Sequence, residues 1–204
     1  GKAFADQVAI ALENARLFDD LQRMAITDPL TGLFNRRYFM KLGALEFERA
    51  IRYNRLLSLV MLDIDYFKQV NDNFGPSLGD QMPVELAECC KAALRTSDIL
   101  CRFGGDEFIM LLPETGIDSA VEIAERLRSK VAGLSIQTET GQPFSISISL
   151  GVVDITCSQP GSLDEFINRV DSALYRAKQD GRNRVCRWEK SMWMGIQHEK
   201  VADS

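Results

Sequence analysis

The sequence predicts an α+β fold in which an antiparallel-rich central sheet is flanked by helices. Residues 99–103 and 107–112 are apolar runs separated by Gly104-Gly105-Asp106, a pattern typical of a β-hairpin with a glycine turn. Residues 144–150 alternate strictly between apolar residues and serine, which predicts a half-buried strand. Segments with helical periodicity separate these strands, and this order along the chain favours a mixed, mainly antiparallel architecture.

The remaining elements follow from periodicity and from turn residues. A continuous apolar run at residues 57–62 predicts a buried strand, and residues 184–188 indicate a last edge strand. A short helix after residue 65 is broken by Asn73-Phe74-Gly75-Pro76. The longer predicted helices cover residues 3–25, 37–53, 78–96, 119–131 and 163–179. We therefore expect a helical stalk (1–25), a globular domain (26–188) and a tail (189–204).

Composition excludes several classes of function. The net charge of −5 argues against binding to a nucleic-acid polymer, because such proteins carry a basic field. The five cysteines include no C-x-x-C spacing, so we expect reduced thiols and a cytoplasmic location. No apolar run is long enough to cross a bilayer, and we expect no membrane contact by this chain. The single histidine, His198, lies in a polar tail, so acid–base and metal chemistry must rest on carboxylates.

The first 25 residues leave two alternatives open. An apolar stripe recurs at spacings of three, four and seven, which fits either one amphipathic helix packed on its own domain or a dimerising stalk. The segment FADQVAIALENARLF is similar to the last helix of a GAF-type sensor domain. We expect the chain to be a fragment that follows an upstream sensor or membrane domain. The stripe consists of Phe4, Val8, Ala11, Ala15, Phe18 and Ala25.

Two acidic clusters follow predicted strands. Asp63 and Asp65 end the run at residues 57–62, and Asp106 and Glu107 lie in the hairpin turn. Such carboxylates repel one another unless a cation binds, and sets of oxygen ligands suit Mg²⁺ or Mn²⁺. Each cluster taken alone also fits a solvated turn. The glycines before Asp106 would allow positive φ angles and a close approach of backbone to a ligand.

Five motifs together resemble the GGDEF diguanylate cyclase family over residues 26–188. The signature Arg-Phe-Gly-Gly-Asp-Glu-Phe at 102–108 is intact, and the other motifs occur in the family's order and spacing. These are DPLTGLFNRR (28–37), DIDYFKQVND (63–72), GD (79–80) and ALYRAKQDGRNR (173–184). The resemblance implies the palm architecture of nucleotidyl cyclases, which is ferredoxin-like, and makes residues 26–188 the catalytic domain.

The resemblance also implies residue roles. Asp63, the carbonyl of Ile64, Asp106 and Glu107 would hold metal, and Glu107 would also activate the attacking 3′-hydroxyl. Asn71 and Asp80 would read the guanine edge. The triphosphate would be held by Lys68, Lys178 and Arg182, with help from the backbone amides of Phe67 and Lys68 at a helix N-terminus. Leu30 would line the base pocket.

The family's reaction joins two GTP molecules into cyclic di-GMP and releases pyrophosphate. By resemblance, each domain holds one GTP with Mg²⁺ or Mn²⁺, and each 3′-hydroxyl attacks the partner's α-phosphorus. A homodimer is therefore required, and a helical stalk could set the pose of two domains.

Arg95 and Asp98 match the family's R-x-x-D inhibitory site, which binds product away from the active site. Arg126 matches a secondary contact to the same product. The bare pattern also fits an Arg95–Asp98 ion pair at a helix end, where residues i and i+3 share a face.

The chain departs from the family pattern at two prolines. Pro76 replaces a histidine, and Pro83 replaces an aliphatic residue of the base pocket. Because proline strains a helix interior, we expect the helix near Asp80 to begin late or to have a distorted first turn. This departure bears on guanine affinity and leaves the metal ligands untouched.

Three alternatives to a cyclase stay open. The chain fits a non-catalytic receptor that senses cyclic di-GMP through Arg95 and Asp98, but its intact Asp106 and Glu107 favour an enzyme. A purely structural dimerisation domain would show no nucleotide-dependent stabilisation. A hybrid cyclase that also uses ATP is disfavoured by Asp80, because a carboxylate repels the adenine N1 lone pair.

Overall fold

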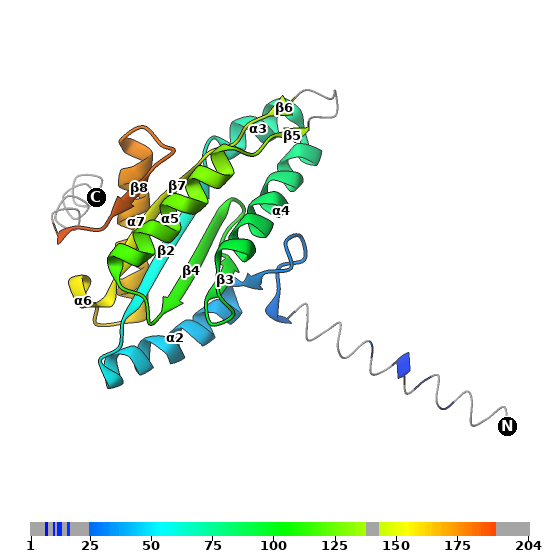
Figure 1. Ribbon diagram of the computed structural model, residues 1–204. Helices are drawn as coiled ribbons and strands as arrows, with labels where there is room; N and C mark the ends of the chain where they lie inside the picture. The colour runs from blue at the N-terminus through cyan, green and yellow to red at the C-terminus, as the bar shows by residue number, and fades with distance from the viewer. Residues whose placement is uncertain are drawn as a thin grey trace, which may run out of the picture.

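The computed structural model describes residues 25–137 and 143–190, together with the single residues 7, 10, 12, 13 and 16 (Figure 1). A central six-stranded sheet runs through the domain with helices packed on both sides. This confirms the predicted α+β class. Within the described residues, no helix has the length and apolar character needed to span a bilayer.

The sheet has the order β1-β3-β4-β2-β7-β8. The four inner strands pair antiparallel, whereas β1 and β8 join the two edges in parallel. The antiparallel-rich prediction is therefore confirmed, with parallel strands at both edges. The strands of the sheet are β1 (Phe34–Asn35), β2 (Leu57–Ile64), β3 (Ile99–Arg102), β4 (Glu107–Pro113), β7 (Ile148–Asp154) and β8 (Val185–Arg187). A separate small hairpin pairs β5 (Ile136–Gln137) with β6 (Pro143–Phe144).

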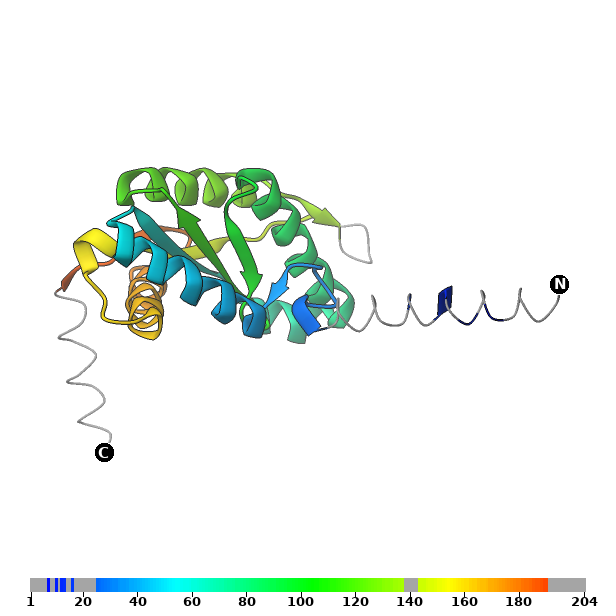
Figure 2. The same cartoon turned by 90° about the horizontal axis from the view of Figure 1, so that it is seen from below.

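Helices cover both faces of the sheet, as Figure 2 shows from below. One face packs against α4 and α5, and the other packs against α2 and α7. The helices are α2 (Arg36–Tyr53), α3 (Phe67–Phe74), α4 (Pro76–Ala93), α5 (Ile117–Ala132), α6 (Ile155–Ser158) and α7 (Leu163–Gln179).

The central strand β2 is buried along its whole length, as its continuous apolar run predicts. Alternate side chains enter the two cores: Val60 and Leu62 face α4 and α5, whereas Leu59 and Met61 face α2 and α7. Asp63 continues the second series. Its carboxylate therefore emerges on the α7 side, where Lys178 meets it.

Strand β7 corrects one prediction. It begins at Ile148, and all seven of its residues are buried, so the half-buried strand expected over residues 144–150 is wrong. The reason is the close approach of α7: a Cβ built on Gly151 would lie 2.4 Å from the backbone N of Leu174 and the backbone O of Val170. The face that carries the serines is thus covered by a helix.

The helix that carries Asp80 corrects a second prediction. It begins at Pro76, so the late start expected from the prolines is wrong. Pro76 occupies the first turn, where a missing N–H costs nothing, and the buried Pro83 lies inside the helix. Because Pro83 has no N–H, the carbonyl of Gly79 lacks its usual helical donor. The helix also ends at Ala93 rather than near residue 96.

Several predictions lie largely outside the described residues. The apolar stripe of the stalk is outside apart from Ala25, and so is the tail from residue 191. The described single residues before Ala25 are helical.

Candidate functional site

Three carboxylates lie together where β2 ends and β4 begins, a place that we call the acidic edge: Asp63 of β2, Asp106 of the hairpin turn and Glu107 of β4. The carbonyl of Glu107 accepts from the backbone N–H of Phe103 at 2.8 Å and of Gly104 at 3.1 Å, which closes the turn. Glu107 is the register partner of Asp63 across β4 and β2, and the N–H of Ile64 donates to the carbonyl of Asp106 at 3.3 Å. Strand pairing alone therefore assembles Asp63, Asp106 and Glu107.

Gly104 lies directly against the side chain of Glu107. A Cβ at residue 104 would lie 2.7 Å from Oε2 of Glu107, so the Glu107 carboxylate rests against this glycine. A Cβ at Gly105 would meet open space, and neither glycine has a positive φ. Neither glycine uses the positive φ that it would allow, and the close approach of backbone to a ligand stays a prediction.

The charges at this edge are unbalanced. Burial raises the pKa of Asp63 to about 6, and repulsion by Asp106 and Glu107 adds to the shift, although the Lys178 ammonium acts against it. That ammonium lies 2.7 Å from Oδ2 of Asp63. Burial, followed by the charge of Asp106, also raises the pKa of Glu107. The edge therefore holds more negative charge than its own cations neutralise.

This imbalance fits a divalent cation. The donors are carboxylate oxygens near a strand-end carbonyl, Ile64, and Mg²⁺ and Mn²⁺ prefer such oxygen ligands. Across residues 25–137 and 143–190, no three or more His, Cys, Asp or Glu side chains are grouped as a ready-made metal cage. Such a site needs substrate phosphates or water to complete the coordination shell.

The N-terminus of α3 lies directly after β2 and suits an anion. This helix has no side-chain cap, so the first backbone amides, those of Phe67 and Lys68, keep free donor capacity. The Arg182 guanidinium stacks 4.6 Å from the ring centroid of Tyr66, the residue that precedes Phe67. With Lys178 held at Asp63, the structure brings three of the predicted triphosphate contacts, Lys178, Arg182 and the α3 amides, to the same strand end.

The predicted base-reading residues lie on the next two helices. Asn71 of α3 rests against Gly79 of α4, because a Cβ at residue 79 would lie 2.3 Å from Oδ1 of Asn71. Asp80, the following residue, is exposed. Leu30 is half-buried in the turn before β1. The structure thus places Asn71 beside the residue that precedes Asp80.

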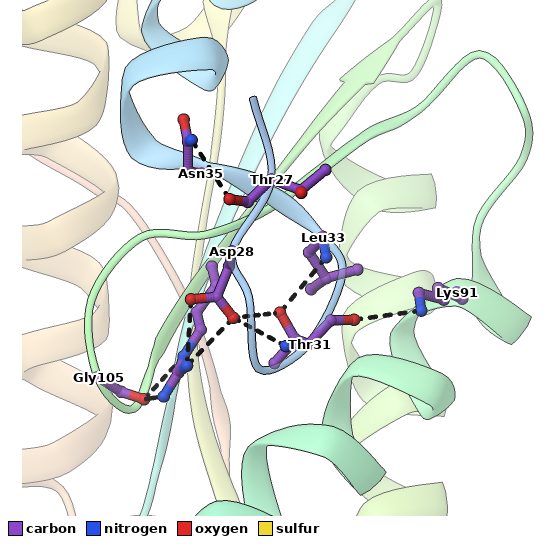
Figure 3. Close-up of polar contacts among 8 residues, drawn as sticks. Thr27, Asp28, Thr31, Leu33, Asn35, Lys91 and Gly105 are labelled. Carbon is purple, nitrogen blue, oxygen red and sulfur yellow. Dashed lines mark hydrogen bonds and ion pairs between the residues drawn. The ribbon is translucent and has the colours of Figure 1, made fainter. Parts of the chain in front are cut away.

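A network around Asp28 connects the turn at residues 28–33 to the signature turn at Gly105 (Figure 3). The Asp28 carboxylate accepts from the N–H of Thr31 at 2.9 Å, from Oγ1 of Thr31 at 2.8 Å and from Arg102 at 3.1 Å. Arg102 also donates to the carbonyl of Gly105, at 2.7 Å from Nη2. Burial raises the pKa of Asp28, but these hydrogen bonds outweigh it and hold the pKa below its ordinary value.

Sequence reasoning gave no role to this pair, although Asp28 and Arg102 belong to two of the quoted motifs. Their separation of 74 positions hides the contact from any local pattern. The presence of both residues in separate motifs was the available signal.

Asp65 is not part of the acidic edge, although sequence reasoning grouped it with Asp63. Its buried carboxylate accepts from Oγ of Ser147 at 2.7 Å, from Oγ of Ser149 at 2.6 Å and from the backbone N–H of Asn183 at 3.0 Å. These donors satisfy the charge internally, and Asp65 has little capacity left for a metal ion.

Two of the three predicted inhibitory residues, Arg95 and Asp98, line one pocket. Arg95 and Asp98 line a cavity of about 340 Å³ together with residues of β1 and α4, and Arg126 of α5 donates to the carbonyl of Ala93 at 3.4 Å. The Asp98 carboxylate accepts from the backbone N–H of Arg95 at 2.8 Å. The two residues occupy the turn after α4, so the expected shared helix face is wrong, and their contact is not a side-chain ion pair.

A mainly antiparallel sheet with strand-end carboxylates, a glycine hairpin and an uncapped helix N-terminus beside them is the arrangement expected of a nucleotidyl cyclase domain. The family model described as "Diguanylate cyclase, GGDEF domain" matches residues 25–184. This chain therefore belongs to the GGDEF diguanylate cyclase family.

Individual relatives agree with this assignment. The chain is 40% identical over 173 residues to diguanylate cyclase DgcM of Escherichia coli K12, which covers 85% of this chain and 41% of DgcM. It is 37% identical over 170 residues to the response regulator PleD of Caulobacter vibrioides, covering 82% of this chain and 37% of PleD. The chain thus spans less than half the length of these two relatives.

Solved structures are also similar. The coiled coil and GGDEF domain of DgcB from Caulobacter crescentus, solved in complex with c-di-GMP, has a TM-score of 0.82 at 28% identity. That match covers 90% of this chain and 96% of the DgcB chain. The active GGEEF domain of a diguanylate cyclase from Vibrio cholerae has a TM-score of 0.71 at 33% identity, covering 76% of this chain and 97% of that one.

Proposed function

We propose that this chain is the catalytic domain of a diguanylate cyclase that condenses two GTP molecules into cyclic di-GMP and releases pyrophosphate. The observation that carries the proposal is the unbalanced acidic edge formed by Asp63, Asp106 and Glu107. Two of these acids have raised pKa values, and a lysine lies in contact with one of them. The choice of reaction, the condensation of two GTP molecules, comes from membership of the family.

Each residue of the edge has a role in this proposal. Asp63, Asp106, Glu107 and the carbonyl of Ile64 would hold Mg²⁺ or Mn²⁺, and a bound ion would neutralise phosphate charge and acidify the 3′-hydroxyl. Glu107 would also accept the proton of that hydroxyl, because its carboxylate lies in the same cluster as the other two acids.

The triphosphate would lie along the strand end and the α3 N-terminus. Lys178, Arg182 and Lys68 supply positive charge, and the amides of Phe67 and Lys68 donate hydrogen bonds to phosphate oxygens. Because Lys178 already contacts Asp63 at 2.7 Å, it can balance that carboxylate while it faces the phosphates.

The base would be read between α3 and α4. Asp80 can accept from guanine N1–H and N2–H together, and Asn71 can add a third hydrogen bond. Leu30 would cover the ring. Adenine lacks this pair of donors, so GTP is the proposed substrate rather than ATP.

Ring closure requires two loaded domains, each supplying one 3′-hydroxyl. We therefore propose a homodimer, with residues 1–25 as the stalk that sets the relative pose of two domains at residues 26–188 and residues 189–204 as a tail. A cytoplasmic location follows from GTP as substrate.

The test is formation of cyclic di-GMP from GTP with Mg²⁺ or Mn²⁺, followed by chromatography. Glu107→Gln should abolish the product. Its matched control is Glu114→Gln, which alters an exposed acid just beyond the other end of β4. No product from the wild-type chain at a concentration where it is dimeric would contradict the proposal and favour a non-catalytic receptor.

A second proposed function is product inhibition through Arg95, Asp98 and Arg126. It is supported by the pocket that Arg95 and Asp98 line, because an arginine and a carboxylate can together bind a guanine edge or a phosphate. Inhibition should be non-competitive with GTP. Calorimetry with cyclic di-GMP tests it: unaltered binding to Arg95→Ala would contradict this site.

A further inference from the structure

Asp65 is a buried acid that the proposed chemistry does not use. Only 5% of its surface is exposed, although it lies two residues after the proposed metal ligand Asp63. Both hydroxyls that donate to it come from the start of β7 and the segment before it, at 2.7 Å from Ser147 and 2.6 Å from Ser149. A buried carboxylate with this many donors has a fixed orientation.

The third donor connects Asp65 to a loop 118 positions away. The backbone N–H of Asn183 donates to Oδ2 of Asp65 at 3.0 Å. This loop joins α7 to β8, and Gly181, Arg182 and Asn183 have φ angles of 115°, 61° and 45°. Left-handed backbone is unfavourable for a residue with a Cβ, so two successive non-glycine residues keep it only where contacts enforce it.

The same loop carries Arg182, whose guanidinium stacks on the Tyr66 ring at 4.6 Å. Tyr66 directly follows Asp65 and itself has a φ of 59°. Asp65 is therefore linked to Arg182 in two ways: through its covalent neighbour Tyr66 and through the hydrogen bond to Asn183, the residue after Arg182.

We propose that Asp65 is a positioning residue that fixes Arg182 for the substrate triphosphate. It holds the loop at 181–183 in its left-handed conformation and places Tyr66 beneath the guanidinium. This inference rests on the proposed function, because it takes from it the role of Arg182 as a phosphate contact.

The test measures binding of 3′-deoxyguanosine 5′-triphosphate with Mg²⁺, since this analogue lacks the attacking hydroxyl and cannot be cyclised. Asp65→Ala should weaken its binding about tenfold by calorimetry, because the arginine loses its fixed pose. Guanosine, which has no phosphate, should bind within about twofold of wild type. Asp65→Asn keeps an acceptor for Asn183 and should restore most of the affinity.

A double-mutant cycle with Arg182→Ala separates positioning from a general loss of structure. In the Arg182→Ala background, Asp65→Ala should weaken triphosphate binding no further. The matched control is Asp154→Asn, which alters a buried acid at the other end of β7 that caps α6 through the N–H of Cys157. That variant should leave triphosphate affinity within about twofold of wild type.

If Asp65→Ala does not fold, Ser149→Ala replaces it in the cycle and should weaken triphosphate binding two- to threefold, again only when Arg182 is present. Equal losses for the triphosphate and for guanosine, or equal losses in both backgrounds, would overturn the positioning role alone. Absence of triphosphate binding to the wild-type chain would overturn the proposed function and this inference with it.

Discussion

Two aspartates on either side of the signature hairpin differ in how their charges are satisfied. Asp28 accepts hydrogen bonds from Thr31 and Arg102, and its pKa is held below the ordinary value. Asp63 is more deeply buried, yet its charged neighbours are one lysine and two further carboxylates, and its pKa is raised to about 6. Both residues lie within the sequence motifs of one family.

This difference distinguishes acids whose charge the protein's own donors stabilise from acids whose charge they leave largely unstabilised. Donors from the protein itself stabilise the charge of Asp28, so its ionisation favours folding. Asp63 lacks enough donors, so its ionisation opposes folding of the metal-free chain, and we propose that a bound cation removes this cost. Asp65 resembles Asp28 in that its carboxylate accepts hydrogen bonds from the protein, although it stands only two positions from Asp63.

The largest effect is expected when a carboxylate of the acidic edge is removed. Asp106→Ala and Glu107→Ala should each lower the rate of cyclic di-GMP synthesis roughly a thousandfold or more, because a lost metal ligand removes several kcal/mol of transition-state stabilisation. Both side chains project from a half-exposed turn, so the fold should survive. Asp118→Ala, an exposed acid on α5, is the control. Near-wild-type turnover in either variant contradicts the assignment.

The next largest effect is expected when Asp28, the acid with protein donors, is removed. Asp28→Ala should lower the free energy of unfolding by about 2–3 kcal/mol at pH 7, because it leaves the largely buried Arg102 without its partner. The measurement is urea unfolding. A lowered pKa in the folded state gives stability that is present above the unfolded pKa of about 3.9 and is lost as pH falls below it. The difference from wild type should therefore shrink in strong acid, and an unchanged difference would argue against a charge-based role.

A smaller effect with the opposite sign is expected at Asp63. Its pKa is about 6 in the folded chain and about 3.9 when unfolded, so the folded state binds more protons between these values. Stability should therefore fall as pH rises from about 4 to 6. Asp63→Asn should stabilise the metal-free chain by about 1–3 kcal/mol at pH 8 and by nothing at pH 4. Destabilisation at pH 8 would show that Lys178 already satisfies Asp63.

The smallest effect is expected at an exposed ion pair, which can be compared with the less exposed pair of Arg102 and Asp28. Arg55 and Glu114 lie 2.8 Å apart, but their side chains are 60% and 59% exposed, against 14% and 19% for Arg102 and Asp28. Arg55→Ala should change the free energy of unfolding by less than about 1 kcal/mol. A loss as large as that of Asp28→Ala would mean that burial does not explain the difference between the two pairs.

The sequence predicted the elements whose pattern is local. The residues of α7, the apolar strand β2 and the glycine hairpin are where periodicity and turn chemistry place them. The buried polar face of β7 was not predictable, because its cover by α7 and the bond from Ser149 to Asp65 leave no mark on the local pattern. The roles of Asp28 and Asp65 were hidden for the same reason, since their key donors are 74 and 82–118 positions away.

The site was predicted through the family resemblance rather than through geometry. Motif order indicated that Asp63, Asp106 and Glu107 belong together, and strand pairing in the structure accounts for their proximity. No local pattern distinguishes Asp63 from Asp65, because their difference depends on which of them receives donors from β7 and from the loop before β8.

The most direct test of this account is the thermal stabilisation produced by Mg²⁺ with 3′-deoxyguanosine 5′-triphosphate. A ligand that binds only the folded state raises its melting temperature, and a variant that binds the ligand more weakly shows a smaller rise. Wild type and Asp28→Asn should both be stabilised, because Asp28 only supports the turn, whereas Asp63→Asn should lose most of the shift. Equal stabilisation of wild type and Asp63→Asn would contradict the claim that the unsatisfied acid is the one that awaits a cation.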